Sequence, residues 1–168
     1  MAVLNWGAPK IEFAVSNNGK PAADAQWTKF GDIVEGTTTL ETSQGDKTEA
    51  KNEAGETVDT RYQKSTFSLS FELFKKKGDT KPIADEDGVI KQNYAVRLTP
   101  EDPTCEGFIM YNASVTLEET WSAADGTHWK YTFDALKPAE DAGNGRMLQP
   151  YTASSSGSGS GSSSGSGE

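Results

Sequence analysis

The sequence contains a single cysteine, Cys105, among its 168 residues. One cysteine cannot form an intrachain disulfide, a C-x-x-C redox pair or a cysteine-rich zinc site. The absence of disulfides favours assembly in a reducing compartment.

Long apolar segments are missing too. No apolar run approaches the roughly 20 residues of a membrane-spanning helix. The N-terminal residues MAVLNWGAPKIEF lack the basic and apolar regions of a signal peptide. We therefore expect a protein that is cytosolic when made and has no membrane partner.

Basic residues are also scarce. The 16 Lys and Arg residues stand against 25 Asp and Glu, which gives a net charge of −9. The sequence shows no Lys/Arg-rich face and no interleaving of basic with aromatic residues, so sequence-specific nucleic-acid binding is not expected. The same charge suits a surface along which nucleic acid slides without adhering, because it repels phosphate groups.

Residues typical of catalytic and ligand sites are sparse as well. His128 is the only histidine, and we interpret it as a surface residue because it falls on the polar face of the last expected strand. No nucleophile-elbow sequence supports a catalytic role for it. The acidic run 85–87 does not fit the EF-hand template. Glu118 and Glu119 point to opposite faces of an expected strand and cannot act together as acid and base. We predict that the protein is not an enzyme and that it has no catalytic residues, no metal site and no cofactor.

Alternation of apolar and polar residues with a period of two dominates the chain and predicts strands. The pattern is clearest over 65–74 and recurs over 11–15 and 94–98. One core can be buried by the roughly 150 residues that precede the C-terminal tail. We predict a mainly β fold, either an antiparallel two-sheet sandwich or a partly open barrel, with at most one short helix. The apolar face of the clearest strand consists of Phe67, Leu69, Phe71 and Leu73.

The last two expected strands form the best hairpin of the sequence. A three-residue loop at 124–126, with Gly126 in the left-handed conformation, would place Trp121 opposite Trp129. Leu117 would then lie opposite Phe133 and Val115 opposite Ala135, so the two apolar faces match. The residues that this hairpin assigns to the core are Val115, Leu117, Trp121, Trp129, Tyr131 and Phe133.

One charged residue, Glu119, falls on the apolar face of this hairpin. In the predicted register it lies opposite Tyr131. Either a bulge or the strand end turns Glu119 outward, or a hydrogen bond satisfies it.

Helix signals are weak. The segment 82–92 could form one or two turns, but Gly88 interrupts it. Residues 138–153 carry Pro and Gly without any period, and we expect an extended C-terminal arm there. Residues 154–168 are almost entirely Ser and Gly, a flexible tail of natural or engineered origin. The remaining residues, 1–137, are expected to form the β domain.

The segment 35–62 is patterned for strands but has almost nothing apolar to bury. Leu40 and Val58 are its only large aliphatic residues, and Ala54-Gly55 signals a turn. An isolated two-stranded hairpin is marginal in water. This polar hairpin arm, at about 38–62, is therefore either disordered or held by something outside its own domain, such as a sheet edge or a neighbouring subunit.

The order of these elements resembles that of the tail tube proteins of long-tailed bacteriophages and related contractile injection systems. The resemblance covers about residues 5–140. It consists of an N-terminal apolar strand, the charged hairpin GDIVEGTTTLETSQGDKTEAKNEAGETVDTR, the strand STFSLSFELF, a variable acidic loop and a closing hairpin that ends in YTFDALKP. Proteins of that family pack two β-sheets with a short helix.

The resemblance implies a structural virion protein that self-assembles into hexameric rings, which stack into a hollow tail tube for DNA passage. It implies further copies of the chain and other tail proteins as partners, DNA that passes without tight binding, and a location in the virion tail after assembly in the bacterial host cytoplasm. On this interpretation, residues 45–61 are the intersubunit arm. Its charged residues, which we assign to assembly, are Asp46, Lys47, Glu49, Lys51, Glu53, Glu56, Asp59 and Arg61.

Two other functions fit parts of the sequence. A monomeric β-sandwich could bind carbohydrate or adhere to a surface through exposed aromatic residues. That hypothesis predicts quenching of tryptophan fluorescence by a glycan and no assembly. A hydrolase could be built around His128, and it would lose its activity in a His128→Ala variant.

Overall fold

The computed structural model describes residue 4 and residues 6–153. The fold is mainly β, as predicted, with 50% of the chain in strands and no helix of seven or more residues in the described part. The strands are β1 (Lys10–Asn17), β2 (Lys20–Pro21), β3 (Thr28–Lys29), β4 (Thr39–Ser43), β5 (Lys47–Lys51), β6 (Thr57–Tyr62), β7 (Thr66–Phe74), β8 (Tyr94–Thr99), β9 (Gly107–Ser122), β10 (Gly126–Ala135) and β11 (Gln149–Tyr151). A 3-10 turn, η1 (Gly143–Gly145), follows β10.

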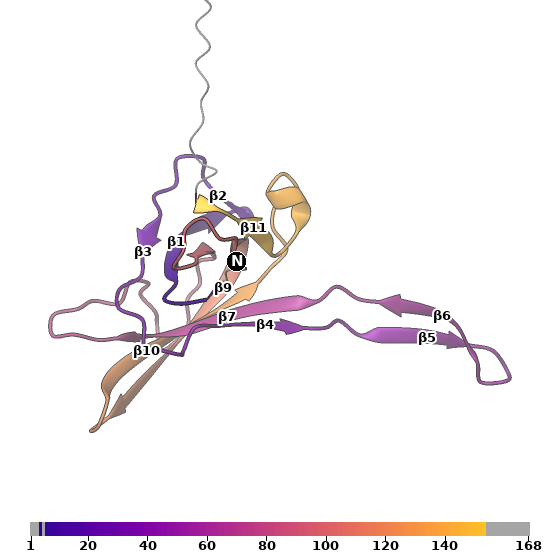
Figure 1. Ribbon diagram of the computed structural model, residues 1–168, viewed down its shortest axis with the longest axis horizontal. Helices are drawn as coiled ribbons and strands as arrows, with labels where there is room; N and C mark the ends of the chain where they lie inside the picture. Colours follow the sequence, from indigo (N-terminus) through magenta and orange to yellow (C-terminus); the bar gives the residue numbers. More distant parts are fainter. Residues whose placement is uncertain (1–3, 5, 154–168) are drawn as a thin grey trace, which may run out of the picture.

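Within the described residues, nine strands form one antiparallel sheet that curls into a half-barrel. Its order is β2-β1-β8-β9-β10-β7-β4, while β3 pairs with β1 and β11 pairs with β9. The strands β5 and β6 form a separate two-stranded sheet that projects from the body (Figure 1). Of the two predicted architectures, this is the partly open barrel with a long polar hairpin.

The core is built from the alternating residues that face one side of the curled sheet. Phe30, from the irregular segment between β3 and β4, is 1% exposed and lies at its centre. Its ring centroid lies 4.6 Å from that of Phe13, 4.8 Å from that of Phe71 and 5.5 Å from that of Tyr131. Of the residues that the sequence assigned to the core, the buried ones are Leu69, Phe71, Leu73, Val115, Leu117, Trp129, Tyr131 and Phe133, and Phe67 is partly buried against them.

Trp121 is an exception, because it is 73% exposed. Its assignment to the core is wrong. The strand β7 ends at Phe74, which pairs with His128. Among the described residues, no third strand lies beside the tip of the β9–β10 hairpin, which extends past the end of β7. Trp121 keeps the correct face of its strand but lies beyond the residues that could cover it.

The register of that hairpin also differs from the prediction. Trp129 lies opposite Glu119, and Trp121 lies opposite Thr127. The loop is 123–125, one residue earlier than expected. A shift of two residues in the pairing leaves every side chain on its predicted face, because strand side chains alternate with a period of two. The alternation therefore predicted the faces correctly, and the turn assignment gave the wrong partners.

Glu119 is not turned outward by a bulge, since the β9–β10 pairing is regular around it. Its carboxylate lies 3.4 Å from Lys81 and 3.9 Å from Lys75. The neighbouring indole N–H of Trp129 lowers the pKa of Glu119 most, although the two groups do not form a hydrogen bond of ordinary geometry. Hydrogen bonding from Lys81 and its positive charge lower this pKa further. Strand-end exposure and these lysines together accommodate the charge.

The segment 82–92 contains no helix. Ile83, which is 1% exposed, anchors it to the core. The hydroxyl of Tyr131 donates to the Ile83 carbonyl oxygen at 2.9 Å and accepts from the Ile83 N–H at 3.4 Å. Val89 then forms a bridge to Thr116 of β9. Backbone hydrogen bonds and one buried side chain hold this segment as a loop.

Residues 138–153 lie along the body instead of extending away from it. Met147 and Leu148 pack against the core, and β11 pairs with the first residues of β9. The side chain of Asn112 donates to the Lys137 carbonyl oxygen at 3.0 Å, where this segment begins. The Ser/Gly-rich tail 154–168 lies outside the described residues.

Candidate functional site: a projecting arm and the groove at its base

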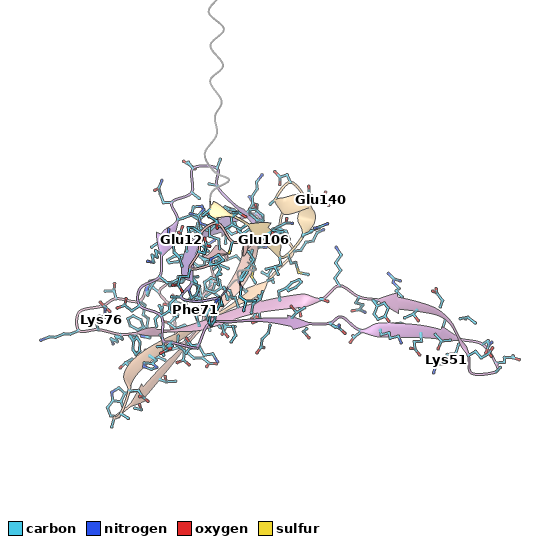
Figure 2. The ribbon with its side chains drawn as sticks, in the orientation of Figure 1. Glu12, Lys51, Phe71, Lys76, Glu106 and Glu140 are labelled. Carbon is cyan, nitrogen blue, oxygen red and sulfur yellow. The ribbon has the colours of Figure 1, made fainter. Side chains whose placement is uncertain are left out.

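The polar hairpin is one long ribbon with two parts. In the proximal part, β4 pairs with β7, the strand whose other residues form the core. In the distal part, β5 pairs with β6, and the same register continues through the junction as far as Ala50 and Asp59. The ribbon extends far from the body (Figure 1). Figure 2 shows Lys51 near its far end and Phe71 in the body. The arm is therefore rooted in a core strand.

The distal part is almost entirely exposed to solvent. All five residues of β5 are exposed, and in β6 only Thr60 is partly covered. Val58 and Tyr62 are 65% and 67% exposed, although both are hydrophobic. An exposed two-stranded ribbon gains little from its own side chains. The arm is thus formed by ladder hydrogen bonds and by its turn.

Asn52 organises that turn. Its Oδ1 accepts hydrogen bonds from the N–H groups of Ala54 at 3.0 Å and Glu56 at 2.9 Å, and its Nδ2 donates to Glu56 at 2.9 Å. Gly55 has a φ of 84°, a conformation that L side chains rarely adopt. The turn predicted at Ala54-Gly55 is therefore present.

A bulge in β6 displays Val58. Asp59 pairs with Ala50, and the next pair joins Lys51 to Thr57, so Val58 is the extra residue. Bulges leave one residue outside the regular ladder and redirect its side chain. A large apolar side chain is consequently presented to solvent near the acidic tip.

The charged residues that the sequence assigned to assembly lie on two faces of the arm and at its tip. Glu49 forms ion pairs with Lys47 and, at 3.7 Å, with Lys51 on one face. The hydrogen bond from Lys47 lowers the pKa of Glu49 and raises that of Lys47. In the described part of the chain, no ion pair includes the remaining residues, which are Asp46, Glu53, Glu56, Asp59 and Arg61.

A groove that the sequence did not predict lies at the base of the arm. It has a volume of about 420 Å³ and lies between the start of β7 and the segment that follows β10. Phe67, Met147 and Leu148 supply apolar side chains, and Lys64 and Arg146 are among the basic residues that line it. The residues come from two segments at least 70 positions apart, and no local sequence pattern connects these segments.

His128 is less exposed than expected, because only 15% of its side chain is accessible. Its Nδ1 lies 3.4 Å from Glu72, and its ring is perpendicular to that of Phe74 with the two centroids 5.0 Å apart. In β10 it pairs with Phe74 of β7 on one side and with Thr120 of β9 on the other, so it is part of the packing around Phe74. Within the described residues, no group of three His, Cys, Asp or Glu side chains is placed to hold a metal ion. None of the helices found there is long and apolar enough to cross a membrane.

Comparisons with known proteins found similar chains among solved structures. No protein-family model and no curated protein matches the sequence. A solved structure with a similar chain is described as the sheath/tube terminator of an extracellular contractile injection system, PVC, in its extended state. The two chains are 14% identical, the match covers 88% of this chain and 99% of that chain, and the TM-score is 0.46.

Proposed function

We propose that this chain is a structural subunit that assembles with copies of itself through its arm. The observation that carries the proposal is the exposure of the distal ribbon, which projects from the body with every β5 residue open to solvent. A marginal ribbon gains stability when another chain pairs with its edges or covers its faces. A ring of identical subunits offers each arm such a partner.

The edges of the main sheet support the same proposal. The strand β4 ends the strand order, and all five of its residues are exposed. At the opposite side of the sheet, β2 and β3 both pair with β1 and cover its outer edge. Unpaired edges are templates for addition of a strand from another chain. One end of the sheet is therefore open to a neighbour, and the arm extends directly from it.

The assembly that we propose is a set of hexameric rings stacked into the hollow tail tube of a virion, with other tail proteins at its ends. The ring number and the passage of DNA follow from the resemblance to tail tube proteins described above. The net charge of −9 supports passage of DNA without adhesion, because like charges repel. The subunit would be made in the bacterial host cytoplasm and would act without an enzymatic step.

Deletion of residues 44–59 tests the role of the arm. The six residues that remain between Ser43 and Thr66 can close the β4–β7 pair, so the core is unaffected. We expect the variant to unfold cooperatively and to stay monomeric, whereas the intact chain forms rings or tubes of roughly 100 kDa per ring, visible by negative-stain microscopy. A deletion variant that still forms rings would remove the arm from the assembly mechanism.

A monomeric binding module is the second candidate, and Trp121 favours it. This side chain is 73% exposed at the tip of the β9–β10 hairpin, where an aromatic ring could stack on a sugar or another flat ligand. The candidate predicts a monomer whose tryptophan fluorescence is quenched by a glycan. An intact chain that assembles and shows no quenching would exclude it.

A further inference from the structure

The groove at the base of the arm combines an apolar floor with a basic rim. Phe67 of β7 and Met147 and Leu148 near the C-terminal end of the body lie along it, and both methionine and leucine also pack against the core. Lys64 lines the groove from the arm, and Lys137 and Arg146 line it from the segment that follows β10. All three basic residues are exposed.

The three basic residues have no acidic partner. Neither Lys64, Lys137 nor Arg146 takes part in an ion pair with any residue that the structure describes, although Asp141 lies close in sequence and is paired with Lys20. Most lysines elsewhere on the body are paired, for example Lys76 with Asp32 and Lys81 with Asp85. In a chain with a net charge of −9, three unpaired cations around one apolar groove form a local site for an acidic, partly apolar ligand.

The distal half of the arm has the complementary composition. Glu53, Glu56 and Asp59 make no ion pair within the described residues, and Val58 stands out of the ladder beside them at 65% exposure. Apolar contact with a groove floor would remove Val58 from water, while the acids would meet the basic rim. Such pairs steer association and fix register more than they add affinity.

The arm cannot reach the groove of its own molecule. Lys64 lies at the base of the same ribbon, and the tip at Gly55 is about ten residues further along it, or roughly 30 Å at the rise of an extended strand. The β5–β6 pairing keeps the ribbon extended, as Figure 1 shows. An arm that occupies such a groove must therefore come from a different copy of the chain.

We propose that the distal arm, residues 51–59, of one copy docks into the groove formed by Lys64, Phe67, Lys137 and Met147 with its neighbours Arg146 and Leu148 on another copy. This inference rests on the proposed function, since it names the surface that receives the arm. The contact joins two different surfaces, so it propagates from copy to copy and closes only if the rotation between copies closes. The groove of each copy lies at the base of that copy's own arm, so each copy can receive one arm and donate another.

Charge reversal tests the pairing. Lys137→Glu with Arg146→Glu reverses the groove, and Glu53→Lys with Glu56→Lys reverses the arm. We expect each pair alone to raise the concentration needed for assembly by about tenfold or more, since each replaces attraction by repulsion. A chain that carries all four substitutions, or an equimolar mixture of the two double variants, should assemble again. Lys29→Glu with Lys77→Glu is the matched control, because it makes the same charge change at exposed sites outside the groove and should assemble normally.

A second measurement uses the unaltered chain. A zero-length carbodiimide crosslinker joins carboxylates to amines in contact, and we expect mass spectrometry to find Glu53, Glu56 or Asp59 joined to Lys64 or Lys137 only in the assembled fraction. If the groove-reversed variant assembles like the intact chain and no such crosslinks form, while deletion of 44–59 still abolishes assembly, the groove inference is wrong and the proposed function stands. If the intact chain stays monomeric, or if the deletion variant still assembles, both the groove inference and the proposed function are wrong.

Discussion

Gly45 lies directly against the backbone of Gln63 where the proximal and distal parts of the arm meet. A Cβ atom on Gly45 would fall 2.3 Å from the Gln63 carbonyl oxygen and 2.7 Å from that of Lys64. Both obstacles are backbone atoms, which cannot rotate out of the way. The two strands of the arm can therefore approach this closely only because residue 45 has no side chain.

We predict that Gly45→Ala displaces the distal arm and weakens assembly while it leaves the core intact. The clash should lower hydrogen-exchange protection of β5 and β6 and reduce the assembled fraction seen by analytical ultracentrifugation. Gly31→Ala is the control, because no atom lies within 4 Å of its Cβ position. Equal assembly of the two variants would show that the junction does not set the arm's geometry.

Substitution of the two tryptophans on one face of the β9–β10 hairpin should distinguish an exposed position from a buried one. Trp129→Ala removes a side chain that is 3% exposed and should cost about 4 kcal/mol of the free energy of unfolding. Trp121→Ala removes one that is 73% exposed and should change it by less than about 0.5 kcal/mol. Urea titrations of the arm-deleted monomer give both values. A large cost at Trp121 would contradict its position beyond the core.

Glu12 should make stability depend on pH. Burial pushes its pKa up, but hydrogen bonds from Lys10 and Arg97 and their charges outweigh this and hold the pKa below its ordinary 4.5. Arg97 also lies over the ring of Trp27 at 4.2 Å and donates from Nε to Glu12 at 3.0 Å. A folded-state pKa that is lowered means that the stabilisation is present above about pH 4.5 and is lost as pH falls through the folded pKa.

Glu12→Gln should therefore destabilise the protein by about 3 kcal/mol at pH 7, since it leaves Arg97 without its carboxylate. The difference from the unaltered chain should shrink as the pH falls below 4.5. Glu41→Gln on exposed β4 is the control and should behave like the unaltered chain at all pH values. The measurement is chemical denaturation from pH 7 to pH 3. A difference that does not vary with pH would rule out the charge as its cause.

Tyr131→Phe should loosen the segment 82–92. The hydroxyl of Tyr131 bonds both backbone groups of Ile83, and its loss leaves buried polar groups unsatisfied at a cost of about 1–3 kcal/mol. Protease cleavage within 82–92 should become faster. Unchanged protease cleavage of 82–92 in Tyr131→Phe would show that the buried Ile83 side chain alone holds this segment.

The same residue should make stability depend on pH. Burial raises the pKa of Tyr131 to about 12 from an ordinary 10.0, so the intact chain should lose stability relative to Tyr131→Phe between these pH values.

The sequence predicted the arm well because the relevant signal is local. Residues 35–62 alternate like strands, lack apolar side chains and contain a turn at Ala54-Gly55, and these features together predict an exposed hairpin. The sequence could not show that β4 and β5 form one ribbon with β6 and β7, because that requires the register of Thr39 with Ser70 and of Lys47 with Tyr62. It also gave no indication of the bulge that displays Val58.

The groove could not be found from the sequence at all. Lys64 lies between β6 and β7 and Phe67 is in β7, whereas Lys137, Arg146 and Met147 follow β10. They meet because β10 pairs with β7 only as far as Asp134 and Ser68, so the chain beyond leaves β7 and crosses to β9 as β11. The C-terminal segment was expected to extend freely, since Pro and Gly punctuation gives no information about what it packs against.

The residue pattern along the chain was enough to predict the mainly β class, the faces of the strands and the polar arm, because period-two alternation involves only near neighbours. The excess of acidic residues follows from composition alone. The half-barrel order, the residue pairs of the β9–β10 hairpin, the exposure of Trp121 and the basic groove became known only from the folded chain. Each of these depends on where one strand ends relative to another, and the pairing of strands distant in sequence is fixed only when the whole sheet closes around its core.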